Sequence, residues 1–108
     1  MLLAGVENNL ISFVGDVTVS NITQAQEELS VVLRQDGSIL VDIDGVGETD
    51  LTFVQLLESA RRKARETGRD LTLRQPANGA VLAVLRRGGF LDDETSESAQ
   101  FWLQGTAQ

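Results

Sequence analysis

The segment Ser38–Ile43, SILVDI, limits the possible fold more than any other part of the sequence. It is a short and mostly apolar run, which is typical of a central strand covered on both faces. An acidic segment with two glycines follows, and apolar residues then recur at helical spacing from about Asp50. A strand that leads directly into a helix is a basic unit of α/β domains. The sequence therefore predicts an α/β fold built around this strand.

One helix is predicted before this strand in the sequence and another after it. The first has two candidate starts, because Asn21 can act as a cap and Thr23 begins a capping-box pattern. The second is predicted to begin near Asp50 and to carry the pair Glu58 and Arg62 on its outer face. Its predicted buried stripe consists of Phe53, Leu57, Ala60 and Ala64.

Three further segments predict strands. Residues 1–6 are typical of a short edge strand, and residues 9–20 contain strand-forming residues that a turn or bulge interrupts at Gly15–Asp16. Residues 70–74 alternate between apolar and polar types, as in a half-buried strand. The expected fold class is therefore α/β, with a mixed sheet of four to five strands and about four helices.

The C-terminal part of the chain predicts two short helices. Residues 76–89 indicate a helix that ends at two glycines. Residues 92–108 are first acidic and then aromatic, and Phe101–Leu103 is expected to fold back as a last helical turn. A partner-docking patch is the alternative, since Trp is enriched at such surfaces. We expect residues 1–91 to form the domain and residues 92–108 to form a helical extension packed on it.

Composition excludes several functional classes. The chain has 108 residues, of which 42% are hydrophobic, enough for one domain with a buried core. It contains neither cysteine nor histidine. Disulfide frameworks, zinc–thiolate sites and nucleophiles activated by histidine are therefore excluded. No apolar run approaches the ~20 residues that span a bilayer, and the N-terminus lacks the basic start of a signal peptide. We expect a cytoplasmic protein without membrane insertion.

Charge is unevenly distributed along the chain. The net charge is −7, and residues 1–58 carry ten acidic side chains but a single basic one, Arg34. Residues 59–91 carry eight basic and two acidic side chains. The net negative charge of the chain argues against binding to nucleic acid, which requires a basic surface. The basic run Arg61–Arg65 is interpreted either as an ordinary solvated helix face or as a surface that docks an acidic partner.

The acidic segment after the central strand suggests two possible functions, phosphatase catalysis and nucleotide binding. Asp42 and Asp44 match the short D-x-D signature of phosphatases of the haloacid dehalogenase family, which use magnesium. That chemistry also requires a lysine and further acids on later strands, and the single lysine, Lys63, lies within a predicted helix. Gly45 and Gly47 precede a helix, but neither a P-loop lysine nor a third glycine follows. Neither chemistry is favoured.

The same segment could also hold a hard cation. Carboxylate oxygens are suitable ligands for calcium or magnesium, but the spacing does not fit an EF-hand loop. We therefore expect no metal, no cofactor and no catalytic residue in this segment. The carboxylates that define this cation hypothesis are Asp42, Asp44, Glu48 and Asp50.

The chain as a whole resembles the STAS domain over about residues 1–91. The resemblance depends on the order of the elements, the motifs VGDV and ILVDIDGV, the spacing from Asp42 to Asp50, and the segment GRDLTLRQPANGAVLAVLRRGGF. STAS domains occur in anti-sigma factor antagonists, in the tails of sulfate transporters and in the small STAS subunit of bacterial phospholipid transport complexes. The resemblance implies a STAS-like fold without catalytic activity.

The resemblance also implies a candidate switch. In antagonists of this family, an aspartate before the second helix is followed by a hydroxyl residue that the partner anti-sigma kinase phosphorylates. That aspartate corresponds to Asp50, the phosphorylated position to Leu51, and the next hydroxyl to Thr52. Leu51 cannot accept a phosphate, so Thr52 becomes the phosphorylation candidate and Thr49 the weaker one. Structural roles remain open for both Asp50, as a helix cap, and Thr52.

The expected function is protein binding in signalling, as an antagonist of an anti-sigma factor or in a chemotaxis or other kinase pathway. The expected partner is an anti-sigma factor or a kinase-like regulator. The first alternative is a subunit docked on the ATPase of a lipid or anion transporter, and the second is a metal-dependent phosphatase. The predicted partner surface comprises Gly47, Glu48, Thr49, Asp50, Leu51, Thr52, Gln55, Glu58 and Arg62.

Overall fold

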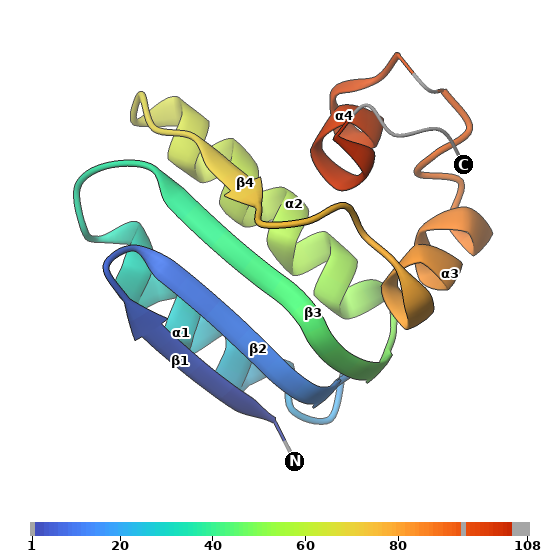
Figure 1. Cartoon of the computed structure of the whole chain (residues 1–108), viewed down its shortest axis with the longest axis horizontal. Helices are drawn as coiled ribbons and strands as arrows, with labels where there is room; N and C mark the ends of the chain where they lie inside the picture. Colours follow the sequence, from blue (N-terminus) through green and yellow to red (C-terminus); the bar gives the residue numbers. More distant parts are fainter. Residues whose placement is uncertain (1, 94, 105–108) are drawn as a thin grey trace.

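Four strands form one mixed sheet in the order β1-β2-β3-β4 (Figure 1). The first pair is antiparallel, whereas β2, β3 and β4 are parallel to one another. In this computed structural model, residues 2–93 and 95–104 are described. The strands are β1 Leu3–Glu7, β2 Leu10–Val17, β3 Ile39–Thr49 and β4 Leu71–Leu73.

The described residues also form four helices, and the predicted α/β class with a mixed sheet is confirmed. Figure 1 shows α1 and α2 on the same face of the sheet, with α3 and α4 near the β4 edge. No helix among the described residues is long and apolar enough to cross a bilayer. The helices are α1 Ile22–Leu33, α2 Leu51–Glu66, α3 Gly79–Arg87 and α4 Glu97–Leu103.

The core lies between the sheet and the two long helices. Ile39, Val41 and Ile43 on β3 are buried against this layer. The rings of Phe13 on β2 and Phe53 on α2 meet edge to face, with centroids 5.4 Å apart, a geometry that favours aromatic pairs. The predicted inner stripe of α2 is confirmed, because all four of its members are buried: Phe53, Leu57, Ala60 and Ala64.

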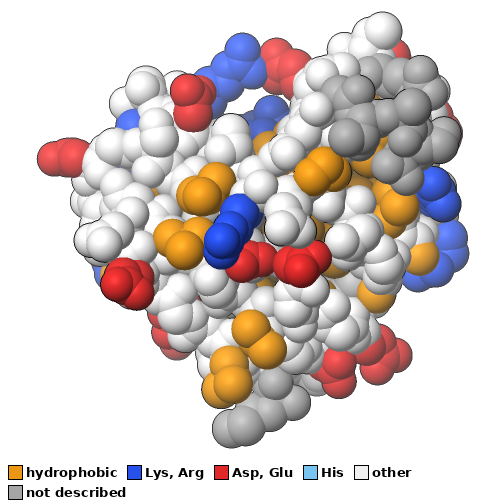
Figure 2. Space-filling model, in the orientation of Figure 1, with side chains coloured by type: hydrophobic (Ala, Val, Ile, Leu, Met, Phe, Trp, Pro, Cys, Tyr) orange, Lys and Arg blue, Asp and Glu red, His pale blue; other side chains and the backbone are white. Residues whose placement is uncertain are grey.

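The opposite face of the sheet is not covered by any described helix, so the expectation of a strand buried on both faces was wrong. Leu40 and Asp44 on β3 are exposed there, and Leu3 on β1 is also exposed. Figure 2 shows this face, with apolar side chains on either side of charged ones. The reason is topological. The parallel strands β2, β3 and β4 lie in the sheet in the same order as in the sequence. When such strands are joined by right-handed crossovers, both connecting helices lie on the same face of the sheet.

β3 is longer than the sequence suggested, and most of the predicted acidic loop is part of it. Ile39–Thr49 pairs with β2, with register shifts where β2 bulges. A Cβ at Gly45 would lie 3.0 Å from Val14 Cγ2, and a Cβ at Gly47 would lie 2.6 Å from Asp16 Oδ1. The two glycines therefore allow β3 to approach β2 closely, rather than forming an open turn.

The start of α1 also differs from one of its two predictions. The N-cap is Asn21, so the alternative cap was the right one and the capping box at Thr23 was wrong. The side chain of Asn21 makes no cap hydrogen bond. Its Oδ1 instead accepts from the Thr18 backbone N–H at 2.9 Å, and its Nδ2 donates to the Asp16 carbonyl at 2.8 Å. Asn21 thus shapes the turn between β2 and α1, which borders the candidate site.

Helix α4 contributes aromatic side chains to the core. Trp102 is fully buried, and its ring meets that of Phe101 edge to face at 4.9 Å. The carbonyl of Trp102 accepts a 2.8 Å hydrogen bond from the Ala77 N–H, between β4 and α3. Gln104, directly after α4, donates from its side chain to the Leu73 carbonyl on β4. These contacts attach α4 to the β4 side of the domain.

Candidate functional site

The junction between β3 and α2 is organised by one carboxylate. Asp50 is the N-cap of α2, as the sequence predicted, and it has an extended backbone. Its Oδ1 accepts a 3.0 Å hydrogen bond from the Thr52 backbone N–H and a second one from the Thr52 hydroxyl. Such bonds satisfy backbone donors that have no partner within the helix. Thr52 is half-buried and its hydroxyl is directed at Asp50.

The second oxygen of Asp50 connects α2 to a distant turn. Asp50 Oδ2 accepts a 2.8 Å hydrogen bond from the backbone N–H of Val19, in the turn between β2 and α1. Burial alone would raise the pKa of Asp50, but hydrogen bonds outweigh this effect and hold the pKa below its usual value. The donors are the Thr52 hydroxyl and the backbone N–H groups of Val19, Thr52 and Phe53. Asp50 is therefore an ionised clamp between two segments of the site.

Thr49, the weaker phosphorylation candidate, has a different environment. It is the last residue of β3 and only 9% exposed. Its hydroxyl donates a 2.8 Å hydrogen bond to the Val17 carbonyl on β2. The hydroxyl is thus engaged with the sheet and is not presented to a kinase.

The outer face of α2 contains only part of the predicted partner surface. Gln55 and Arg62 are exposed, but the prediction that Glu58 lies on this face was wrong, because Glu58 is 3% exposed. The predicted pair of Glu58 with Arg62 was wrong as well. Glu58 Oε1 binds Arg61, at 2.8 Å from Nη2 and 3.0 Å from Nε, and its other oxygen accepts from the Ser98 hydroxyl.

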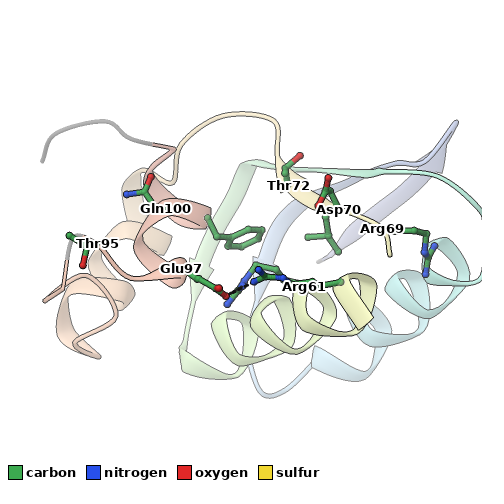
Figure 3. Close-up of a pocket in the computed structure, with 10 residues that line it drawn as sticks. Arg61, Arg69, Asp70, Thr72, Thr95, Glu97 and Gln100 are labelled. Atoms are coloured by element: carbon green, nitrogen blue, oxygen red, sulfur yellow. Dashed lines mark hydrogen bonds and ion pairs between the residues drawn. The ribbon is translucent and has the colours of Figure 1, made fainter. Parts of the chain in front are cut away.

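Two arginines of α2 form a charge network with α4. Arg65 Nη1 lies 2.6 Å and Arg61 Nη1 3.6 Å from Glu97 Oε2. The Arg61 guanidinium also lies over the ring of Phe101, 5.5 Å from its centroid. The hydrogen bond from Arg65, together with charge attraction, lowers the pKa of Glu97. Figure 3 shows Arg61 and Glu97 beside an open pocket between α2, β4 and α4. This pocket has a volume of about 400 Å³.

The carboxylates of the cation hypothesis are not gathered into one cluster. Asp42 accepts from the Asp44 backbone N–H and lies 3.4 Å from Arg74, and Asp44 accepts from Asn78 at 3.1 Å. Asp50 is engaged as the helix cap. Across the described part of the chain, no three acidic side chains are grouped so that they could hold a metal ion.

Comparison with known proteins identifies the family. The family described as "Mlab, STAS domain" matches residues 4–93. The chain belongs to the STAS domain family. No curated protein matches the sequence at a significant level.

Solved structures show the same fold at low sequence identity. The anti-sigma factor antagonist SpoIIAA in its unphosphorylated form is similar with a TM-score of 0.59 and 13% identity, over 80% of this chain and 82% of that one. An anti-sigma factor antagonist from Mycobacterium paratuberculosis has a TM-score of 0.57 and 17% identity, over 85% and 76%. A protein described as Mglu has a TM-score of 0.52 and 11% identity, over 70% of this chain and 20% of its own.

Sequence reasoning missed two parts of the site in this STAS domain. Val19 lies in the turn that Asp50 clamps and is 67% exposed, a large exposure for an apolar side chain. The last turn of α3, with Arg87 and Gly88, borders a pocket at the start of α2. The apolar Val19 in an otherwise polar turn was the available signal for the first part. Nothing in the sequence indicated that α3 ends beside Leu51.

Proposed function

We propose that this STAS domain is a non-catalytic regulatory module that binds another protein through the start of α2. We further propose that phosphorylation of Thr52 controls this binding, and that the partner is an anti-sigma factor or a kinase-like regulator. The observation that carries the proposal is the Asp50 clamp, which holds the Thr52 hydroxyl, the start of α2 and the turn at Val19 together. The likeness to two structures of anti-sigma factor antagonists supports the choice of partner.

The surface around the clamp has the character of a binding surface. Leu51 and Val19 are 42% and 67% exposed on either side of Asp50. Exposed polar residues lie close to Leu51 in the sequence, including Glu48 and, on the exposed side of α2, Gln55. Apolar side chains within a polar border are typical of surfaces that bind proteins.

A phosphate on Thr52 would act directly on the clamp. It adds about −1.5 to −2 charges at neutral pH, next to the ionised carboxylate of Asp50. It also removes the hydroxyl proton that Asp50 now accepts. The N-terminus of α2 stabilises the negative charge of a phosphate, so the helix tolerates the modification. The same negative charge repels the carboxylate of Asp50. Asp50 would then release the Val19 N–H, and the turn beside the binding surface would change.

The absence of catalysis is supported by the roles of the acidic side chains. Asp42 and Asp44, which the phosphatase alternative would use, are engaged with Arg74 and Asn78. Gly45 and Gly47 are packed against β2, in contrast to a loop that cradles phosphate.

Residues 1–91 form the STAS-like domain in this proposal, and residues 92–108 form an extension. The family match ends at residue 93, which supports this division. The extension includes α4, which covers Glu58 and so removes it from the partner surface. Thr49 is buried as well. The proposed surface is therefore confined to Gly47, Glu48, Asp50, Leu51, Thr52, Gln55 and Arg62.

The test is to measure binding of the protein to a candidate kinase-like regulator. We expect Thr52→Glu to weaken binding while leaving the melting temperature nearly unchanged, because the N-terminus of α2 favours the added negative charge. We expect Thr52→Ala to bind but to resist phosphorylation. Thr72→Glu, which changes an exposed threonine on β4, is the matched control and should bind normally. Phosphate should be mapped by mass spectrometry after incubation with ATP. Normal binding by Thr52→Glu, or phosphate only at other residues, would refute the switch.

A further inference from the structure

A second pocket lies directly beside the proposed switch. It has a volume of about 260 Å³ and opens between the start of α2 and the last turn of α3. Leu51, 42% exposed, forms one wall, and Val84, which is 5% exposed, contributes to the other side. The complete lining consists of Thr49, Asp50, Leu51, Val84, Arg87 and Gly88.

The polar groups of this lining are satisfied, with one exception. The Thr49 hydroxyl donates to the Val17 carbonyl. The Asp50 carboxylate accepts from the Thr52 hydroxyl and from backbone N–H groups of α2 and of the neighbouring turn. The exposed guanidinium of Arg87 has no hydrogen bond or ion pair with any residue that the structure describes.

The remaining chemistry of the pocket is thus apolar with an unpaired positive charge at its rim. The negative charge of Asp50 is stabilised by donors at the N-terminus of α2, whereas nothing similar neutralises Arg87. In protein interfaces, much of the binding energy comes from a few side chains that fill pockets on the partner. An unpaired charge at its edge selects partners of the opposite charge.

We propose that this pocket receives an apolar side chain from an acidic segment of the partner, with a neighbouring carboxylate bound to Arg87. The proposal rests on the proposed function, because it assumes that the start of α2 is the partner surface. It also gives phosphorylation a second effect. A phosphate on Thr52 would repel an acidic segment that approaches the first turn of α2, so charge repulsion and loss of the Asp50 clamp act in the same direction.

Short synthetic peptides provide a probe that does not require the natural partner. Three acetylated and amidated peptides are compared: leucine alternating with glutamate, leucine alternating with lysine, and serine alternating with glutamate. Each is titrated into ¹⁵N-labelled protein while amide chemical shifts are recorded. We expect the leucine–glutamate peptide to shift the amides of Leu51 and Gly88, and the other two peptides to bind about tenfold more weakly or not at all.

Charge reversal makes the test specific. Arg87→Glu should abolish binding of the leucine–glutamate peptide and improve binding of the leucine–lysine peptide. Arg34→Glu, an exposed arginine after α1, is the matched control and should leave both titrations unchanged. Leu51→Ser should weaken binding of either leucine peptide. Equal binding of acidic and basic peptides, or no shift at Leu51 and Gly88, would overturn the inference.

The two proposals can fail separately. If Thr52→Glu weakens binding of a kinase-like regulator while Arg87→Glu affects neither this regulator nor the peptides, the pocket inference is wrong and the switch stands. If the peptides bind through Arg87 but Thr52 is never phosphorylated and Thr52→Glu has no effect, the switch is wrong and the pocket stands.

Discussion

The start and the middle of helix α2 differ in how they are covered. At its start, Leu51 is exposed, Thr52 is half-buried and Asp50 accepts hydrogen bonds from Thr52 and from the Val19 N–H. At its middle, α4 covers Glu58, which is bound to Arg61 and Ser98. The same helix therefore has one end, its start, open to other molecules and a middle region sealed by its own chain.

This difference indicates where changes affect binding and where they affect folding. Exposed charges and single hydrogen bonds contribute little to stability because water competes for them. Buried aromatic rings and a buried ion pair contribute much more, or destabilise strongly when one partner is lost. We therefore expect substitutions at the start of α2 to alter partner binding, and substitutions under α4 to alter the free energy of unfolding.

The largest effect should come from the sealed region. Trp102→Ala removes a fully buried ring and should lower the free energy of unfolding by about 3–5 kcal/mol. Trp102→Phe should lower it less, because it leaves a smaller cavity and removes a buried Nε1–H that has no acceptor among the described residues. The measurement is unfolding in denaturant, with Leu51→Ala as the control at the open end. A loss below ~1 kcal/mol for Trp102→Ala would mean that α4 does not seal this region.

A smaller effect is expected from the cap at the open end. Asp50→Ala removes the side-chain bonds to Thr52 and to the Val19 N–H. We expect a loss of about 1–2 kcal/mol, the upper range for a helix cap. Asp50→Asn retains an oxygen that can cap the helix and should fall between the wild type and Asp50→Ala. Amide exchange should show that Val19 becomes less protected in Asp50→Ala; unchanged protection would contradict the clamp.

The smallest effect concerns the exposed rim of the contact between α2 and α4. The hydrogen bond from Arg65 lowers the pKa of Glu97 from its usual value of 4.5. A carboxyl whose folded-state pKa is lowered stabilises the fold above its unfolded-state pKa, and loses this effect as the pH falls through the lowered value. At pH 7 the melting temperature of Glu97→Gln should be slightly below that of wild type. The difference should disappear as the pH falls below 4.5, and a difference that persists in acid would refute this account.

Local patterns in the sequence predicted much of the fold. The 3.6-residue period identified the inner stripe of α2, and Asp50 before that stripe identified its N-cap. Both features depend on residues within one or two helical turns of each other. The element order and motifs, which resemble those of STAS domains, indicated the family that the comparison confirmed.

Other features depended on segments that are remote in the sequence. The glycines of the acidic segment suggested a turn, but they allow β3 to continue beside β2 and bury the Thr49 hydroxyl. The pattern of residues within one strand does not reveal which distant strand it pairs with, because the packing of a strand depends on side chains of its neighbours in the sheet. The uncovered face of the sheet likewise follows from the direction in which the parallel strands are connected.

The α/β class, the buried stripe of α2 and its cap at Asp50 can be predicted from the sequence alone, because these features depend on periodicity and on hydrogen bonds between near neighbours. The burial of Glu58 and the exposure of Leu51 depend instead on tertiary packing. Ser98, which binds Glu58, is 40 positions away, and Val19, which binds Asp50, is 31 positions away. Whether a polar side chain on a helix faces water or protein depends on which distant segment packs over it, and helical periodicity carries no information about that segment.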